Sequence, residues 1–344
     1  MDNKIKTALC SFGMSGWVFH APFIDLHPGF HLQGVWERTK NLAAEKYPGT
    51  KTYRSLEELL ADPETELVVV NTPSVFHYEH AKQSLLAGKH VIVEKPFTAT
   101  AEEAAELIEI AEKNELILSV YHNRRYDSDF RTIKKILDQG SLGEIVDAEF
   151  RYDRFVPSLS HKQHKENPTA AVGCLYDLGS HLIDQAIQLF GMPRSVFADI
   201  RTNREGSLVD DYFHLLLDYP SHPVSLRSSY FVKEAFPGYA LHGKKGSFIK
   251  SKTDVQEQAL IAGKKPGTED WGMEPEENDG LLHTETTREK VRSEKGNYGD
   301  FYEGIWQCLR KNGPVPVSGE QGMKVIHVIE AAFTSHLEKK QISL

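Results

Sequence analysis

A lysine at the end of an apolar stretch is the residue of this sequence best placed for chemistry. Residues 91–93 are valine, isoleucine and valine, and Glu94, Lys95 and Pro96 follow them directly. Such a run predicts a buried strand, and open parallel sheets bind ligands at the carboxyl ends of their strands. An ammonium group at that edge can lower the pKa of a substrate hydroxyl. The alternative is an ordinary surface lysine, because most lysines lie in solvent.

A second group of polar residues has helical spacing. Asp177, His181 and Asp184 stand at i, i+4 and i+7, so a helix through them carries one polar stripe, with leucines on its opposite side. There His181 can act as a general base, Asp177 can position substrate hydroxyls or tune the imidazole, and Asp184 can support them from behind. Two other interpretations stay open: a solvated helix face, and an Asp/His metal site, for which no further ligand cluster is evident.

A glycine-containing turn follows a short apolar run at 7–10 and precedes a helix predicted from Trp17 onward. The segment has the form of a dinucleotide fingerprint in which serine replaces the first glycine. Such a turn lets a pyrophosphate approach backbone N–H groups at a helix N-terminus, where the helix dipole favours an anion. The residues expected to bind the cofactor here are Ser11, Phe12, Gly13, Met14, Ser15 and Gly16.

Apolar runs and amphipathic stretches alternate through the first part of the chain. Strands are predicted at 7–10, 31–36, 67–71, 91–94 and 116–120, and helices at 41–47, 55–61, 77–87 and 101–114. Thr100, with Glu103 three residues later, predicts a capping box at the start of the last of these helices. This order favours a parallel sheet, and residues 1–123 are therefore predicted to form a Rossmann dinucleotide-binding domain of the α/β class.

The pattern changes beyond residue 123. One helix is predicted at 127–139, and longer alternating strands follow at 145–155, 196–201, 211–217 and 224–231. Residues 124–344 are therefore predicted to form a C-terminal α+β domain with a large, mostly antiparallel open sheet. The polar segment 262–295 predicts a long surface excursion, and residues 319–337 predict an amphipathic helix that packs on either domain.

Composition limits the class of protein. A chain of 344 residues exceeds what one core usually organises, and 40% hydrophobic with 26% charged residues is typical of a globular protein. The net charge of −9 disfavours nucleic acid and anionic membranes as partners, and no apolar run approaches the roughly 20 residues of a membrane helix. The three cysteines lack metal-ligand spacing and the N-terminus lacks a long apolar core, so we expect no metal site and a cytoplasmic location.

Together these motifs resemble the Gfo/Idh/MocA family of NAD(P)-dependent oxidoreductases over essentially the whole chain. The matching segments are the glycine turn, residues 71–73 with His77, residues 94–96, residues 142–145, and residues 177–181 with Asp184. Residues 18–22, 119–125 and 175–177 resemble, within that family, the bacterial NADP-dependent scyllo-inositol 2-dehydrogenase branch. The resemblance assigns the catalytic pair to Asp177 and His181.

The resemblance implies a dehydrogenase that acts on CH–OH groups, with hydride transfer between NADP or NAD and a secondary alcohol of a cyclic polyol or sugar. His181 would accept the proton, and Lys95 would stabilise the alkoxide. The further cofactor-binding residues implied are Glu37, Arg38, Thr39, Asn71, Thr72, Pro73, His77, Glu94 and Lys95. The substrate-binding residues expected are His122, Asn123, Arg124, Tyr152, Arg154 and Tyr176.

The signals for the choice of cofactor conflict. Glu37 can accept hydrogen bonds from ribose hydroxyls and so favours NAD, whereas Arg38, with Thr39 and Lys40, can hold the 2′-phosphate of NADP. We favour NADP. For His77, a packed or capping histidine is an equal alternative to a cofactor contact, and Arg154 is as readily a surface charge as a substrate contact.

Two other functions stay open. One is a nucleotide-binding sensor without turnover, and the other is an aldose or other sugar dehydrogenase on the same scaffold. A small-molecule polyol or sugar is the expected partner. We also expect a homodimer or homotetramer formed through the C-terminal sheet, because its open face would otherwise expose apolar surface.

Overall fold

The chain forms two compact units in the computed structural model, which describes residues 4–162 and 165–344. Unit 1 holds the residues up to Asn123 together with Gln256–Trp271 and Asn297–Met323. Unit 2 holds Arg124–Val255, Gly272–Gly296 and Lys324–Leu344. Both of the later segments of unit 1 lie within residues 124–344, the range predicted for the second domain.

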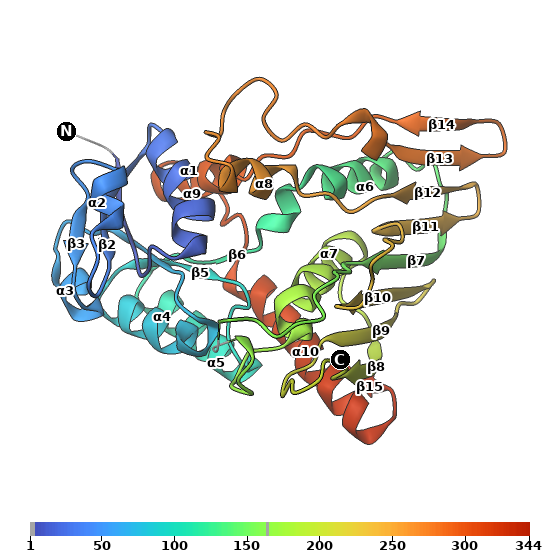
Figure 1. Cartoon of the computed structure of the whole chain (residues 1–344), viewed down its shortest axis with the longest axis horizontal. Helices are drawn as coiled ribbons and strands as arrows, with labels where there is room; N and C mark the ends of the chain where they lie inside the picture. The colour runs from blue at the N-terminus through green and yellow to red at the C-terminus, as the bar shows by residue number, and fades with distance from the viewer. Residues whose placement is uncertain (1–3, 163–164) are drawn as a thin grey trace. The chain divides into compact units, whose positions relative to one another are not determined.

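Six parallel strands form the sheet of unit 1 (Figure 1). In sheet order they are β3 (Lys51–Tyr53), β2 (Phe30–Trp36), β1 (Ile5–Leu9), β4 (Leu67–Val70), β5 (His90–Glu94) and β6 (Leu118–Tyr121). β4 and β6 are buried at every residue, as expected for parallel strands covered on both faces. The strand order reverses between β1 and β4, and doubly wound sheets bind ligands at such a switch point.

Up to residue 113 the helices of unit 1 follow the strands as the sequence predicts, and two later helices, over 255–261 and 299–311, were not predicted. They are η1 (Gly16–His20), α1 (Ala21–Leu26), α2 (Leu42–Lys46), α3 (Leu56–Ala61), η2 (Ser74–Phe76), α4 (His77–Leu86), α5 (Ala101–Lys113), α8 (Val255–Ile261, whose first residue belongs to unit 2) and α9 (Gly299–Lys311). The predicted capping box is present. The Thr100 hydroxyl accepts a hydrogen bond from the Glu103 N–H (3.1 Å), and the Glu103 carboxylate accepts one from the Thr100 N–H (3.3 Å).

A nine-stranded sheet forms the body of unit 2 (Figure 1). In sheet order its strands are β14 (Arg288–Val291), β13 (Gly280–Thr284), β12 (Gly246–Lys250), β11 (Tyr239–Gly243), β7 (Ile145–Arg151), β10 (Pro223–Ser229), β9 (Tyr212–Asp218), β8 (Ser195–Arg201) and β15 (Ile342–Ser343). β7 and β10 are parallel, and every other neighbouring pair is antiparallel. The predicted mostly antiparallel sheet is confirmed.

The strand expected at 145–155 is shorter than predicted, since β7 ends at Arg151. The Asp153 carboxylate accepts a hydrogen bond from the Ser229 N–H (3.0 Å). This backbone N–H therefore binds a side chain instead of a carbonyl oxygen of a neighbouring strand. Beyond Arg151 single backbone hydrogen bonds to β10 continue, from Tyr152 to Arg227 (3.0 Å) and from Arg154 to Ser229 (2.9 Å), but the regular strand does not.

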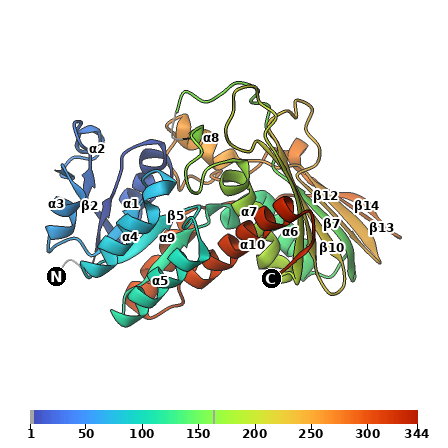
Figure 2. The ribbon, with the colours of Figure 1, turned by 90° about the horizontal axis from the view of Figure 1, so that it is seen from below.

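Helices cover one face of this sheet and leave the other open (Figure 2). α6 (Ser128–Asp138), α7 (Ser180–Phe190) and the part of α10 (Gly319–Glu338) that belongs to unit 2 lie on the same side. The turns η3 (Asn123–Tyr126), η5 (Leu175–Gly179) and η6 (Glu276–Asn278) complete the helical segments. Phe197 and Leu216 pair across β8 and β9 on the open face and are 43% and 44% exposed. No helix of the described residues is long and apolar enough to cross a membrane.

The prediction of a surface excursion over 262–295 missed two strands, β13 and β14, although most residues of the segment are exposed. Glu274 and Lys250 form an ion pair (2.5 Å) in which neither side chain is exposed. The hydroxyls of Ser128 and Ser293 also donate to the Glu274 carboxylate (2.5 and 3.0 Å). A buried pair makes polar residues part of the interior, which composition alone does not reveal.

Replacing Lys250 with Met should lower the free energy of unfolding of unit 2 by about 3–5 kcal/mol, because it leaves the Glu274 carboxylate buried without its cation. The exposed pair Lys244–Glu144 (2.6 Å) is the matched control, and Lys244→Met should change stability by no more than about 1 kcal/mol. Urea unfolding followed by circular dichroism measures both. Equal effects of the two substitutions would contradict a structural role for the buried pair.

Candidate active site

The fingerprint residues form a tight turn between β1 and η1. The Ser11 hydroxyl accepts a hydrogen bond from the Gly13 N–H (3.0 Å), so serine itself stabilises the turn in which it replaces glycine. At Gly16 a Cβ would lie 2.3 Å from the carbonyl oxygen of Ser11, and only glycine fits there. Gly13 and Met14 are exposed, as a turn that receives a ligand requires.

Asn71 joins the end of β4 to this turn. Its amide nitrogen donates to the Ser11 carbonyl (2.9 Å) and to the Ser15 hydroxyl (3.3 Å). Its amide oxygen is buried and has no hydrogen-bond partner among residues 4–162 and 165–344. This oxygen is therefore an acceptor that a ligand donor can satisfy.

His77 links two loops at the same edge of the sheet. Its Nδ1 lies 2.7 Å from the carbonyl oxygen of Pro96, and its Nε2 lies 2.9 Å from that of Thr72. Burial lowers the pKa of His77, although the two carbonyl oxygens and the Glu94 charge oppose that shift. Since both ring nitrogens face protein acceptors, the geometry makes His77 a link between loops. Pro73, next to Thr72, is exposed.

The Glu37 carboxylate does not extend into solvent. It accepts hydrogen bonds from the N–H groups of Leu42 (3.1 Å) and Ala43 (3.0 Å), and so caps the first turn of α2. Arg38 and Thr39 follow it and are exposed. Backbone N–H groups thus bind the Glu37 carboxylate, whereas the side chains of Arg38 and Thr39 are accessible to solvent.

β5 delivers Glu94 and Lys95 to the same edge as the turn, and the Lys95–Pro96 peptide bond is cis. One Glu94 oxygen accepts from the Lys95 backbone N–H (3.1 Å), and the other lies 3.0 Å from His20 Nε2. Burial would raise the pKa of Glu94, but the hydrogen bond from His20 and the nearby His20 and Lys95 charges outweigh it and hold that pKa below its usual value.

The polar stripe of unit 2 begins in a π turn. Asp177 lies in η5, and His181 lies in the first turn of α7. A π turn closes between residues five apart, and here the Ser180 N–H donates to the Leu175 carbonyl. His181 is almost fully buried, whereas the Asp177 side chain is 29% exposed.

Asp184 continues this stripe into the interior. Its two carboxylate oxygens accept from Arg125, at 2.6 Å from one guanidinium terminal nitrogen and 2.8 Å from Nε. Such a bidentate pair fixes the helix that carries His181.

Asp210, which was not among the predicted site residues, holds the turn that carries Asp177. Its carboxylate accepts from the Leu175 N–H (2.7 Å), and its carbonyl accepts from the Cys174 N–H (2.9 Å). Gly173 has φ = +111°, and a Cβ there would lie 1.9 Å from the Asp210 carboxylate. Burial raises the pKa of Asp210 to about 6, against the hydrogen bond from Leu175. Nothing in the sequence distinguishes it from the exposed acids.

Tyr152 is surrounded by cations. The guanidinium carbons of Arg124 and Arg154 lie 5.9 and 5.3 Å from the centre of its ring, and Lys252 Nζ lies 5.1 Å away. The ring of His181 is 6.3 Å from that of Tyr152. Three cationic side chains and the His181 ring therefore surround the ring of Tyr152.

The cations differ in their acidic partners. Arg124 pairs with Asp254 and lies 3.5 Å from Asp127, and Lys252 pairs with Asp127 at 3.3 Å and with a second buried aspartate at 3.1 Å. In the described part of the chain, Arg154 has no carboxylate within 4 Å. It is half buried, so its guanidinium has donors to offer to a bound molecule.

The structure divides the expected residues between the two units. His122 and Asn123 are buried at the end of β6 in unit 1, with the glycine turn, Asn71, Glu94 and Lys95. Arg124, Tyr152, Arg154, Asp177 and His181 belong to unit 2, as does Tyr176, whose ring stacks on Phe333 of α10 at 5.8 Å.

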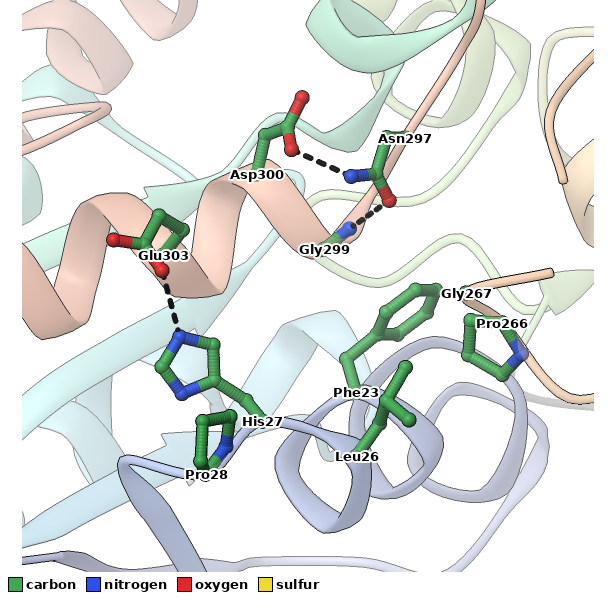
Figure 3. A pocket seen from close by; sticks show the side chains of 10 residues that line it. All are labelled: Phe23, Leu26, His27, Pro28, Pro266, Gly267, Asn297, Gly299, Asp300 and Glu303. Carbon is green, nitrogen blue, oxygen red and sulfur yellow. Dashed lines mark hydrogen bonds and ion pairs between the residues drawn. The ribbon is translucent and has the colours of Figure 1, made fainter. Parts of the chain in front are cut away.

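A cavity of about 280 Å³ in unit 1 lies apart from these residues (Figure 3). Ten residues of α1, α9 and neighbouring loops line it, and none belongs to the expected site. Its polar groups bond to one another, with His27 Nε2 2.9 Å from Glu303 and the Asn297 amide 2.5 Å from Asp300. Across the described residues, no group of three His, Cys, Asp or Glu side chains is arranged to hold a metal ion.

Two family models cover most of the chain. One, described as the NAD-binding Rossmann fold of an oxidoreductase family, matches residues 5–122. The other, the C-terminal alpha/beta domain of the same family, matches residues 134–344. The chain belongs to the Gfo/Idh/MocA oxidoreductase family. The expected fold and the resemblance to this family are thereby confirmed.

Individual relatives agree with this assignment. The chain is 42% identical to the scyllo-inositol 2-dehydrogenase (NADP(+)) IolW of Bacillus subtilis, over 99% of this chain and 96% of that protein. The solved structure of the oxidoreductase yvaA from Bacillus subtilis covers 100% of this chain and 99% of its own, with a TM-score of 0.96 and 41% identity. The D-glucoside 3-dehydrogenase of Escherichia coli is 29% identical over 56% of this chain and 56% of that protein.

Proposed function

We propose that this family member is an NADP-dependent dehydrogenase that interconverts a secondary alcohol of a cyclic polyol, of the scyllo-inositol kind, and the corresponding ketone. The observation that carries the proposal is Lys95 at the carboxyl end of β5, beside a Glu94 carboxylate that is bonded at both oxygens. That edge is the ligand-binding edge of a doubly wound sheet. The similarity to the dehydrogenase of Bacillus subtilis supports the substrate class.

The reaction separates a proton from the hydroxyl oxygen and a hydride from its carbon. The nicotinamide, when bound, accepts the hydride. His181 takes the hydroxyl proton as general base, and the Lys95 ammonium stabilises the developing alkoxide. Asp177, held by the π turn that Asp210 caps, orients the substrate hydroxyls. In the reverse direction His181 returns the proton and a ketone is reduced.

Substrate recognition in this proposal depends on hydrogen-bond donors in unit 2. Arg154 lies beside Tyr152 without an ion pair to a described carboxylate, so its donors can bind the hydroxyl oxygens of a polyol. Arg124 is neutralised by Asp254 and Asp127, and we assign it to holding Tyr152 in place.

The preference for NADP follows from residues 37–39. Because both oxygens of the Glu37 carboxylate accept N–H groups of α2, this side chain is held by the backbone instead of by the ribose hydroxyls. The exposed Arg38 guanidinium and Thr39 hydroxyl then form the phosphate site. The glycine turn and Asn71 bind the remainder of the nucleotide.

A sugar dehydrogenase on the same scaffold is the second candidate. The similarity to the D-glucoside 3-dehydrogenase of Escherichia coli favours it, although the match covers only about half of each chain. Both candidates use the same chemistry at a CH–OH carbon, so a substrate panel distinguishes them.

Replacing Lys95 or His181 with Ala should lower the kcat of NADP-dependent oxidation by at least about 100-fold, the usual contribution of a general acid–base group. The measurement is the absorbance of reduced nicotinamide, with scyllo-inositol, myo-inositol and common sugars offered separately. Lys113→Ala and His283→Ala, at exposed positions in each unit, are the matched controls and should retain activity.

Each result of this panel has one meaning. Turnover of scyllo-inositol that depends on Lys95 and His181 supports the proposal, and turnover of sugars alone favours the second candidate. Unchanged kcat in both variants contradicts the assigned roles. No turnover of any substrate, with NADP binding intact, favours a sensor that binds nucleotide without reaction.

Arg38→Ala should raise the KM for NADP by about 10–100-fold, because a charge-assisted hydrogen bond to phosphate contributes roughly 1.5–3 kcal/mol. The KM for NAD should stay nearly constant, since NAD carries no 2′-phosphate. Initial rates with each cofactor measure the change, and Arg288→Ala on β14 is the control for loss of an exposed arginine. An equal rise for both cofactors would place Arg38 outside the phosphate site.

We also propose that the open face of the nine-stranded sheet pairs with a second copy of the chain. Phe197 and Leu216 lie side by side on that face and are about two-fifths exposed, although burial is what large apolar side chains favour. Light scattering should give a mass of two or four chains, and Phe197→Glu with Leu216→Lys should reduce it toward one. A wild-type monomer at the same concentration would refute this arrangement. The cytoplasmic location stays a prediction from the sequence.

A further inference from the structure

A buried hydrogen-bond chain lies behind Glu94 in unit 1. His20 Nε2 lies 3.0 Å from one Glu94 carboxylate oxygen, and His20 Nδ1 lies 2.7 Å from the Tyr302 hydroxyl. The His20 side chain is 0% exposed and that of Glu94 is 12% exposed. These two hydrogen bonds connect Tyr302 of α9, through His20 at the end of η1, to Glu94 at the carboxyl end of β5.

The Glu94 carboxylate can only accept, so His20 donates to it from Nε2. Burial and the Glu94 charge raise the pKa of Tyr302 well above its usual value, so its hydroxyl keeps its proton. That hydroxyl is the partner of His20 Nδ1, and both ring nitrogens of the fully buried side chain are thereby satisfied.

Aromatic rings surround these three residues. The Tyr121 ring on β6 packs against the His20 ring at 4.6 Å, and further aromatic rings pack around that of Tyr302. Glu94 and Tyr302 are the hydrogen-bond partners of His20, and Glu94 in turn lies near His77 and Lys95.

Hydrogen bonds hold both oxygens of the Glu94 carboxylate. One oxygen receives the His20 N–H, and the other receives the backbone N–H of Lys95 (3.1 Å). A carboxylate held in this way keeps its negative charge at a fixed position beside Lys95. That charge attracts the Lys95 ammonium, the group that stabilises the alkoxide in the proposed reaction.

We propose that His20 and Tyr302 are positioning residues that fix the ionised Glu94 carboxylate and, through it, the Lys95 ammonium. The proposal rests on the function proposed above, because that function gives Lys95 its role. His20 and Tyr302 act through Glu94 and need no contact with substrate or cofactor. His20 belongs to the segment 18–22, to which the proposed reaction assigns no other role.

The test compares His20→Ala, His20→Gln and Tyr302→Phe by steady-state kinetics as a function of pH. His20→Ala removes the donor to Glu94, so kcat should fall about tenfold and the alkaline limb of the kcat profile should move to lower pH by about half a unit or more. His20→Gln keeps an N–H donor that reaches Glu94 and should restore most of kcat. Tyr302→Phe removes one hydroxyl and should move the limb in the same direction by less. The KM for NADP should stay the same throughout.

Tyr53→Phe is the matched control. Tyr53 is also buried in unit 1, and its hydroxyl donates to a carboxylate, that of Asp62 (2.6 Å), at the edge strand β3. Its loss should lower the melting temperature without moving the pH profile. If His20→Ala does not fold, Tyr302→Phe and His20→Gln carry the test, because each keeps most of the side-chain volume.

The outcomes separate this inference from the proposed function. If Lys95→Ala abolishes turnover while folded His20→Ala and Tyr302→Phe keep the wild-type kcat and alkaline limb, this inference is wrong and the proposed function stands. If Lys95→Ala keeps activity, the proposed function itself is wrong. A change in melting temperature alone, as in Tyr53→Phe, would show that these hydrogen bonds only stabilise the fold, and would also overturn the inference.

Discussion

The parallel pairing of β1, β4 and β5 is the constraint on which unit 1 depends. β1 pairs in register with β4, and β4 with β5, up to the last residues of the strands. The segments that follow therefore leave the sheet at one level, and Ser11, Asn71 and Glu94 come to the same edge. Asn71 then bonds to the glycine turn, and His77 bonds to the loops after β4 and β5. The local chemistry of the turn is thus a consequence of strand register.

Much of this fold could be predicted because its signals are local. Thr100 and Glu103 are three residues apart and define the start of α5, and the β-branched runs define the buried strands. β3 escaped prediction because three residues give too short a pattern. The outer strands after Glu274 were misread as an excursion, because the lysine that neutralises this acid lies on another strand. Pairings between distant residues carry no periodic signal.

The same distinction holds within the expected sites. The position of Lys95 at the end of a strand follows from the apolar run before it, and so does its proximity to Glu94. That His20 supports Glu94 does not follow, since 74 residues separate them. Nor does the sequence distinguish Arg124 from Arg154, because the acid that neutralises Arg124 is 130 residues away. Sequence patterns therefore locate charged side chains better than they indicate which charges remain uncompensated.

In each unit one helix is preceded by a π turn, η1 before α1 and η5 before α7. A π turn contains one residue more than an α turn, and each residue of a helix corresponds to a rotation of about 100°. In an α-helix Asp177 and His181, four residues apart, would lie on one face with an offset of ~40°. The wider π turn advances each residue by a smaller angle and so changes that offset. The angle between the two side chains is therefore set by the number of residues in the turn, and a single inserted or deleted residue there would change it without any change of side chain.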